Sequence, residues 1–222
     1  QTFTYDIIVR NNKKEDVKNT IETFLNLEDE KARIKFNLGK DVRDWQVNFA
    51  RRDLENAYPS KGVFTKILYR PFDEKWTFYT GKSRGFHCYP RAEVMQHILN
   101  KENIALSLKR QSKFDFSYCF VHKNICEACL FESAYANNSV FPLYLYPEDD
   151  SLEKERTPNL NMEIVNQIAE KLGLKFVNEK PDTNEETTNG INPFLAPIDI
   201  LDYIYAVLHS PNYREKYKEF LK

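Results

Sequence analysis

The chain has 222 residues, of which 41% are hydrophobic and 29% are charged, as is typical of a globular protein with a sizeable core. It has no run of 18 apolar residues and no basic-then-apolar N-terminus, so we expect neither a membrane-spanning helix nor a secretion signal. Four cysteines are too few for a disulfide scaffold, which indicates a reducing compartment, and we expect a cytoplasmic protein.

The charges are unevenly distributed, although the net charge is only −1. Residues 1–60 carry 11 cations and 11 anions, and residues 124–222 carry 9 cations and 17 anions. Residues 61–123, which we call the basic segment, carry 12 cations and 5 anions. A basic segment in a nearly neutral chain is typical of a local surface that binds an anion, but the charge alone does not identify that anion.

The N-terminal part of the chain predicts a strand followed by helices. The β-branched and aromatic run Phe3–Val9 predicts a strand, and apolar residues at helical spacing predict a helix over Glu15–Leu27. Residues 28–40 are charged and predict a connection. Asp41 is a suitable cap for a second helix that ends near Asn56.

The basic segment predicts mostly strands. Short apolar or alternating runs indicate strands over Val63–Tyr69, Lys75–Thr80, Ile104–Lys109 and Phe116–Val121, with a short helix over Arg91–Leu99. Aromatic and cationic side chains alternate through residues 67–95, and Gly81 and Gly85 bracket a turn that carries Lys82 and Arg84.

The remaining third adds strands and then helices. Cys129–Glu132 and Val140–Tyr146 are expected to be strands, and helices are expected over Asn161–Leu172, with Gly173 as its stop, and over Pro197–Leu208. Pro211 opens a last amphipathic helix. Because strands and helices do not alternate regularly, we predict an α+β fold, with a mixed or antiparallel sheet flanked by helices and a C-terminal helical segment.

Cys119, His122, Cys126 and Cys129 lie close enough in sequence to suggest a zinc cluster. Structural zinc sites usually join two ligand pairs that are a dozen or more residues apart, and this spacing differs. Cys119 also lies in an apolar stretch, where it is expected to be a small core residue. We therefore predict no metal site.

The acidic residues favour a solvated surface over a nuclease centre. Asp149, Asp150, Glu153 and Glu155 lie in a polar loop rather than in the strand context that metal-dependent nucleases use. The sequence also lacks a phosphate-binding glycine loop, an HExxH motif and a nucleophile elbow. We predict no catalytic residue in this chain.

Several strings resemble the C-terminal specificity region of Type ISP restriction–modification enzymes. They are ILYRPFDEKWTFYTGKSRGFHCYPRAEVMQHIL (67–99), ENIALSLKRQ (102–111), FPLYLYP (141–147), TPNLN (157–161) and PIDILDYIYAVLHSPNYREKYKEFLK (197–222). The resemblance runs from about Asp41 to Lys222. It implies that residues 41–222 form a target-recognition domain and that residues 1–40, a strand–helix segment, form the seam to a methyltransferase domain outside this sequence.

The resemblance implies recognition of double-stranded DNA, with catalysis in other domains of the parent chain. S-adenosylmethionine is implied for the methyltransferase domain, and no cofactor is expected in this chain. The chain lacks the methyltransferase's cofactor loop and its NPPY-type tetrapeptide.

A target-recognition domain needs cations that hold phosphates and fork or amide side chains that read base edges. Lys109 is a candidate phosphate contact, and Arg84, Arg110 and Gln111 are candidate base readers. The predicted DNA-binding residues are Arg70, Lys75, Lys82, Arg84, Arg91, Lys109, Arg110, Gln111 and Lys113.

Two alternatives stay open at this point. Arg70 is equally compatible with a scaffold role, paired with Asp73 or Asp115. The chain could also be a protein-docking module that links the methyltransferase and motor domains, a role that suits the aromatic C-terminal helices over residues 197–222.

Overall fold

The computed structural model describes residues 6–109, 119–131, 138–148, 151–181 and 193–221. The chain divides into two compact units. The first unit comprises Gln1–Lys101 and Asn124–Asn138, and the second comprises Glu102–Lys123 and Ser139–Lys222. The helices in the described part of the chain are too short or too polar to cross a bilayer.

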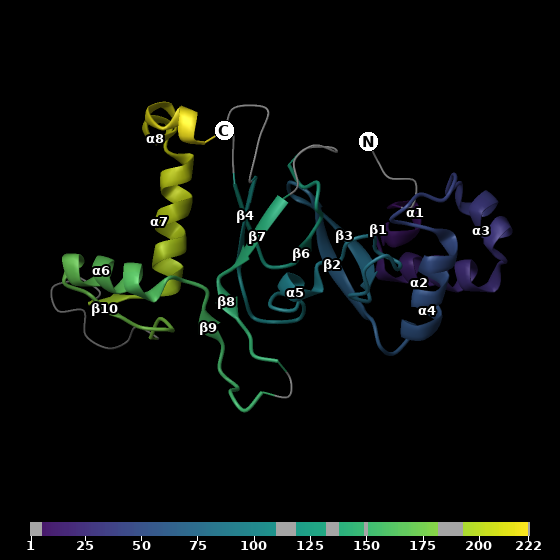
Figure 1. Cartoon of the computed structure of the whole chain (residues 1–222), viewed down its shortest axis with the longest axis horizontal. Helices are drawn as coiled ribbons and strands as arrows, with labels where there is room; N and C mark the ends of the chain where they lie inside the picture. The colour runs from purple at the N-terminus through teal and green to yellow at the C-terminus, as the bar shows by residue number, and fades with distance from the viewer. Residues whose placement is uncertain (1–5, 110–118, 132–137, 149–150, 182–192, 222) are drawn as a thin grey trace. The chain divides into compact units, whose positions relative to one another are not determined.

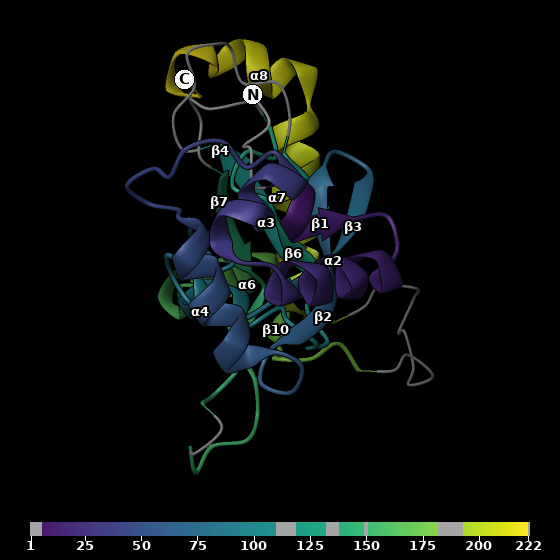
Figure 2. The same cartoon turned by 90° about the vertical axis from the view of Figure 1, so that its right-hand side faces the viewer.

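The first unit begins with helices: α1 (Asp6–Val9), α2 (Lys14–Asn26), α3 (Asp29–Phe36) and α4 (Val47–Ala57). They gather on one side of the sheet of this unit, as the two views in Figures 1 and 2 show. A short helix, α5 (Ala92–Met95), follows the sheet's main hairpin.

The sheet of the first unit has the strand order β1–β3–β2–β6. Its strands are β1 (Arg10–Asn11), β2 (Val63–Arg70), β3 (Asp73–Tyr79) and β6 (Ile125–Cys126). β3 is antiparallel to both β1 and β2, whereas β6 runs parallel to β2. The β2–β3 hairpin is the longest pairing, and its register runs from Val63 opposite Tyr79 to Arg70 opposite Asp73.

The core of the first unit joins the helices to β3 and to the loop that follows it. Phe24 from α2, Leu54 from α4 and Phe78 from β3 are fully buried, and so is Phe86 beyond the end of β3. Phe86 therefore anchors the segment after β3 in the core of the first unit.

The second unit contains several small sheets. β4 (Ala105–Lys109) lies between β5 (Phe120–His122) and β7 (Asn138–Pro142) and is antiparallel to β5. β8 (Tyr144–Leu145) pairs antiparallel with β9 (Thr157–Pro158), and β10 (Lys175–Phe176) pairs parallel with β11 (Phe194–Leu195).

Helices complete the second unit: α6 (Met162–Leu172), α7 (Pro197–His209), α8 (Pro211–Lys216) and the 3-10 turn η2 (Lys218–Phe220). α7 packs through Leu201 on a small core. This core contains Leu106 of β4, Tyr144 of β8, and Leu143, which directly precedes β8. Figure 1 shows α7 beside β4 and β7 within this unit.

The predicted α+β class, with mixed and antiparallel sheets and a helical C-terminal region, is confirmed. The long helix predictions agree closely, with α2, α6 and α7 each within a residue or two of the expected range. α4 begins later than predicted, at Val47, although the Asp41 side chain does accept a hydrogen bond from the Val47 amide at 3.1 Å.

Three local predictions were wrong. Within the predicted strand at the N-terminus, Asp6–Val9 is a helical turn, because Ile8 and Val9 are both buried, and consecutive burial does not suit a half-exposed strand. The charged connection contains α3, and the described part of Cys129–Glu132 is a turn in which Leu130 and Phe131 are both buried.

The helix expected over Arg91–Leu99 is also shorter than predicted, because only Ala92–Met95 is α-helical. Residues on both sides of residue 40 share the core of the first unit, since Ala32 and Leu38 pack with Trp45 and Val47. The division at residue 40 into a seam and a recognition domain stays a prediction.

Candidate nucleic-acid interface

Residues 80–91, which we call the anchored loop, are fixed at two points by one buried carboxylate. Asp53 of α4 is 2% exposed, and its Oδ2 atom accepts hydrogen bonds from Thr80 Oγ1 at 2.7 Å and from the Phe86 amide at 2.8 Å. Gly85 lies so close to this carboxylate that a Cβ atom there would be 2.3 Å from Asp53 Oδ2. The start and the middle of the loop are thus tied to α4.

Further hydrogen bonds hold the rest of the anchored loop. Trp45 Nε1 donates to the Phe86 carbonyl at 3.2 Å, and the Tyr79 hydroxyl donates to the Pro90 carbonyl at 2.8 Å. The Arg84 amide donates to the Cys88 carbonyl at 2.9 Å, which closes the loop on itself. Binding residues carried by such a loop are held in place before a ligand arrives.

His87 is the loop's inward-facing side chain. Its Nε2 atom lies 3.0 Å from Thr77 Oγ1, and that hydroxyl donates its proton to the Val9 carbonyl at 2.6 Å. His87 Nε2 must therefore carry a proton and donate to Thr77, so the ring is neutral with an unprotonated, buried Nδ1. Burial, assisted by the charge of Arg10, lowers the pKa of His87 to about 3.

The anchored loop presents cations and an aromatic ring to solvent. Lys82, Arg84 and Arg91 are exposed, and Tyr89 is 56% exposed. These are the predicted DNA-binding residues that the first unit brings together on one rigid segment. Lys82 has no carboxylate partner among the described residues, so its charge is available to an anion.

Arg84 lies against the protein surface. Its guanidinium donates to the Arg43 carbonyl at 2.8 Å and lies 5.0 Å from the centre of the Phe49 ring. Its backbone φ of 55° is in the left-handed region, which a non-glycine residue adopts only at a cost of about 1 kcal/mol or more. The loop therefore holds Arg84 in a fixed orientation.

Acidic neighbours limit the positive charge of this surface. Arg91 pairs with Glu93 at 3.0 Å, and Arg43 pairs with Asp44 at 2.7 Å. Hydrogen bonds from Arg43 and Tyr89, together with the nearby charges of Arg43 and Arg84, hold the pKa of Asp44 below its usual range. Asp44 thus stays ionised at neutral pH and offsets part of the cationic cluster.

Sequence reasoning missed Arg43 and Tyr89 as members of this surface. The Arg43 side chain is 85% exposed, but it lies between Asp41 and Asp44 in a segment with no net charge, so a charge count does not reveal it. Tyr89 is one of several aromatic residues in residues 67–95, and nothing in the sequence pattern distinguishes it from the others.

Arg70 and Lys75 lie at the other end of β3, near the hairpin turn. Lys75 Nζ is 3.1 Å from Asp73 and 2.7 Å from Asn12 Oδ1, so this lysine is partly neutralised. Arg70 and Asp73 lie opposite each other in the hairpin, but their side chains do not form the ion pair considered above. The Arg70 guanidinium instead stacks on Tyr69, 4.0 Å from the centre of its ring. At about 3.3 Å per residue, the length of β3 separates this end from the anchored loop by roughly 20 Å.

The remaining predicted site residues belong to the second unit or lie outside the described residues. Lys109 is half-buried at the end of β4. Arg110, Gln111 and Lys113 fall outside the residues that the structure describes, as does Asp115, the other proposed partner of Arg70. Whether all predicted cations form one surface therefore stays a prediction.

The cysteines and His122 each have separate neighbours. Cys119 Sγ lies 3.7 Å from His209 Nδ1, His122 Nε2 lies 2.7 Å from Ser107 Oγ, and Cys126 accepts a hydrogen bond from Asn138. Across residues 6–109 and the other described ranges, no three His, Cys, Asp or Glu side chains are grouped as a metal ion would require.

A family model described as "Type ISP C-terminal specificity domain" matches residues 2–222. No curated protein sequence matches the chain. Three solved structures have similar folds, and each covers nearly all of this chain.

The first is the ATP-dependent Type ISP restriction–modification enzyme LlaBIII bound to DNA, with 18% identity, a TM-score of 0.58, and coverage of 97% of this chain. A DrdV–DNA complex has 19% identity, a TM-score of 0.55 and the same coverage. A nuclease-deletion mutant of the Type ISP enzyme LlaGI with a DNA substrate mimic has 15% identity, a TM-score of 0.54 and 98% coverage. This chain spans only 13%, 19% and 15% of those chains, respectively.

Proposed function

Because the chain belongs to the family of Type ISP C-terminal specificity domains, we propose that it recognises a DNA sequence on behalf of a larger restriction–modification enzyme. The observation that carries this proposal is the family match over residues 2–222. The positive charge of the basic segment and the cations of the anchored loop support it, because DNA recognition needs cations for phosphates and donor side chains for base edges.

In this function the anchored loop supplies both kinds of DNA contact. Lys82, exposed and without a described acidic partner, binds a phosphate and fixes the register of the domain. The Arg84 guanidinium donates one hydrogen bond to the Arg43 carbonyl, and its remaining donors suit the O6 and N7 acceptors of guanine in the major groove. Arg110 and Gln111 remain candidates for reading further bases.

The parent enzyme supplies the chemistry on DNA. We infer that a methyltransferase domain of the same parent chain, which binds S-adenosylmethionine, is the partner that acts on the recognised site, in the cytoplasm. The similar structures support this inference, because they are several times longer than this chain and two of them are named as restriction–modification enzymes.

The test is duplex binding and methylation by the parent enzyme with single substitutions in the anchored loop. Lys82→Ala should weaken binding to all duplexes alike and lower the slope of log K against log salt by about one. Arg84→Ala should cost about 1–3 kcal/mol on the cognate site and little on other sites, because it removes a base contact.

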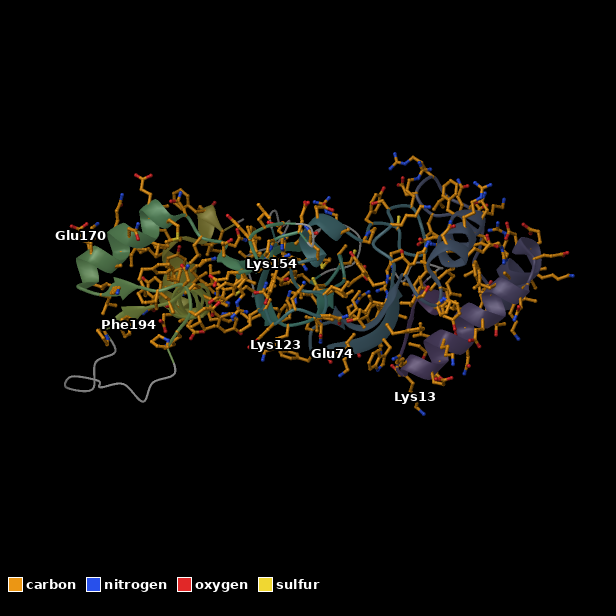
Figure 3. The ribbon with its side chains drawn as sticks, turned by 90° about the horizontal axis from the view of Figure 1, so that it is seen from below. Lys13, Glu74, Lys123, Lys154, Glu170 and Phe194 are labelled. Atoms are coloured by element: carbon orange, nitrogen blue, oxygen red, sulfur yellow. The ribbon has the colours of Figure 1, made fainter. Side chains whose placement is uncertain are left out.

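Lys13→Ala is the matched control, since Lys13 is an exposed lysine of the same unit that lies at the start of α2, outside the anchored loop (Figure 3). Its binding and methylation should equal those of the wild type. If Lys82→Ala, Arg84→Ala and the control all retain wild-type affinity, salt slope and methylated site, the anchored loop does not bind DNA.

A second candidate function is docking within the parent enzyme, and the outer face of α6 favours it. Ile164, Ile168 and Leu172 recur at every fourth residue and are 55%, 39% and 61% exposed, so they form an apolar stripe on one side of this helix. The occupant would be another domain of the parent chain, because this chain is a small fraction of its relatives' length.

This second function predicts that Ile168→Lys in the parent enzyme lowers the methylation rate and splits thermal unfolding into separate transitions. Duplex binding by the 222-residue chain itself should not change. Glu170→Lys on the same helix, whose side chain is exposed and visible in Figure 3, controls for added charge. Unchanged methylation and unfolding of the Ile168→Lys enzyme would exclude docking through α6.

A further inference from the structure

A tight turn carries Arg43 and Asp44 beside the anchored loop. The Val42 amide donates to the Trp45 carbonyl at 3.1 Å, so Arg43 and Asp44 are the central residues of this turn. Trp45 is 2% exposed and belongs to the core of the first unit. The position of the turn is therefore set by the packing of the core.

The anchored loop also holds the backbone of this turn. Arg84 Nη2 donates to the Arg43 carbonyl at 2.8 Å, and the Cys88 thiol donates to the Asp44 carbonyl at 3.2 Å. Both carbonyls at the tip of the turn are thus bonded to side chains of the loop. The backbone that carries Arg43 is fixed before a ligand arrives.

The Arg43 side chain is held in place although it is 85% exposed. Its Nε and Nη2 atoms donate to the two carboxylate oxygens of Asp44 at 2.9 Å and 2.7 Å. The Tyr89 hydroxyl donates to the same carboxylate, and this bond raises the pKa of Tyr89 above its ordinary value. Two parallel bonds to a carboxylate fix the plane of a guanidinium, whereas an unpaired arginine in water samples many rotamers.

This pairing leaves the outer edge of the guanidinium available. A guanidinium has five N–H groups, and the bonds to Asp44 and Tyr89 use at most three of them. Among the residues that the structure describes, no other group accepts a hydrogen bond from this side chain. Arg43 therefore presents at least two donors to solvent in a fixed plane.

We propose that Arg43 reads a guanine from the major groove, and that Asp44 and Tyr89 position its guanidinium for this contact. The inference rests on the proposed function and adds a base reader from outside the basic segment, which begins at residue 61. Two donors in one plane match the O6 and N7 acceptors, which lie side by side on the major-groove edge of guanine.

A base edge explains this arrangement better than a phosphate does. The Asp44 carboxylate is ionised at neutral pH, because hydrogen bonds from Arg43 and Tyr89 lower its pKa. Its negative charge repels a phosphate and offsets the attraction that Arg43 alone would exert. A guanine edge carries no net charge, so it is recognised through the direction of the donors, which the bonds to Asp44 fix. Lys82, without an acidic partner among the described residues, suits a phosphate better.

The experiment measures binding of the 222-residue chain to a duplex that contains the site methylated by the parent enzyme. Each guanine of the site is replaced in turn by 7-deazaguanine, which keeps the base pair but lacks the N7 acceptor. For the wild type, replacement of at least one guanine should weaken binding about 3-fold to 10-fold, as expected for one hydrogen bond. In Arg43→Ala, one of the sensitive guanines should become insensitive, because its donor is gone.

Two further variants separate base reading from phosphate binding. Arg43→Gln replaces the planar fork by an amide, which suits adenine, so it should lower the preference for guanine over adenine at that position. A phosphate contact would weaken binding to all bases alike. Asp44→Asn removes a negative charge and loosens the guanidinium, so it should bind unrelated duplexes more tightly and discriminate the site less.

Arg52→Ala is the matched control, since Arg52 is an exposed arginine on α4 of the same unit. It should keep the wild-type sensitivity to 7-deazaguanine at every position and the wild-type preference for guanine.

Arg43 does not read a guanine if every sensitive guanine stays sensitive in Arg43→Ala, if no guanine is sensitive in the wild type, or if Arg43→Gln keeps the wild-type base preference. When the wild type still prefers its site over unrelated duplexes, each of these results leaves the proposed function intact. If the wild type binds all duplexes equally or binds none, both the inference and the proposed function fail.

Discussion

At the scale of single residues, buried polar groups determine where the exposed cations lie. Asp53 accepts hydrogen bonds from Thr80 and from the Phe86 amide. Because Asp53 lies in a helix 27 residues before Thr80, no local pattern in the sequence reveals these contacts. His87 likewise links the anchored loop to Thr77 of β3. The cations were predictable from the sequence, whereas the groups that orient them depend on tertiary packing.

His87 predicts a specific pH dependence of stability. Its pKa is lowered to about 3 in the folded protein, so between that value and its unfolded value near 6.5 the unfolded chain binds more protons. The stabilising contribution is therefore complete above about pH 6.5 and is lost as the pH falls toward 3. From pH 7 to pH 5 the free energy of unfolding should decrease by about 2 kcal/mol on account of this residue.

Urea unfolding at several pH values measures this effect. His87→Gln should remove most of the decrease, although it lowers stability at pH 7 by loss of the Thr77 contact. His97→Gln is the control, because burial also lowers the pKa of His97 and its contribution must be subtracted. An unchanged pH profile in His87→Gln would show that His87 is not buried in its neutral form.

At the scale of elements, helices with caps and apolar periodicity were predictable from the sequence, whereas a helix without apolar periodicity was not. α6 was predicted well because Asn161 caps its first amides, at 3.1 Å and 3.2 Å, and Gly173 ends it in the left-handed conformation. α3 was missed because only Ala32 is buried, so it has no apolar periodicity. Ion pairs such as Glu30–Arg33 and the left-handed cap Asn37 support it instead.

The anchored loop predicts an unusual sensitivity at Gly85. A methyl group there would lie 2.3 Å from Asp53 Oδ2, so the loop or α4 must shift and the Asp53 hydrogen bonds must stretch. Gly85→Ala should lower the free energy of unfolding by about 1–3 kcal/mol and weaken duplex binding, because the cations lose their fixed orientation.

Urea unfolding and duplex binding of the same preparation test this prediction. Ser83→Ala, an exposed residue of the same loop, should change stability by less than about 0.5 kcal/mol. A Gly85→Ala protein with wild-type stability would mean that the close approach of the loop to Asp53 is not required.

At the scale of the whole molecule, the sequence predicted the fold class and the family but not the division into units. The basic segment contributes residues 61–101 to the first unit and residues 102–123 to the second. The predicted DNA-binding residues are divided in the same way, with Lys82, Arg84 and Arg91 in one unit and Lys109 in the other. Proximity along the chain could not reveal this, because the chain passes between the units more than once.

The most direct test of the central claim is selection of duplexes from a randomised library by the 222-residue chain, followed by sequencing. If the chain is a DNA specificity module, one sequence should be enriched, and it should be the site that the parent enzyme methylates. Selection with Arg84→Ala should lose the preference at one or more positions of that site. If the wild-type chain binds all duplexes equally, or binds none, it does not specify the DNA sequence.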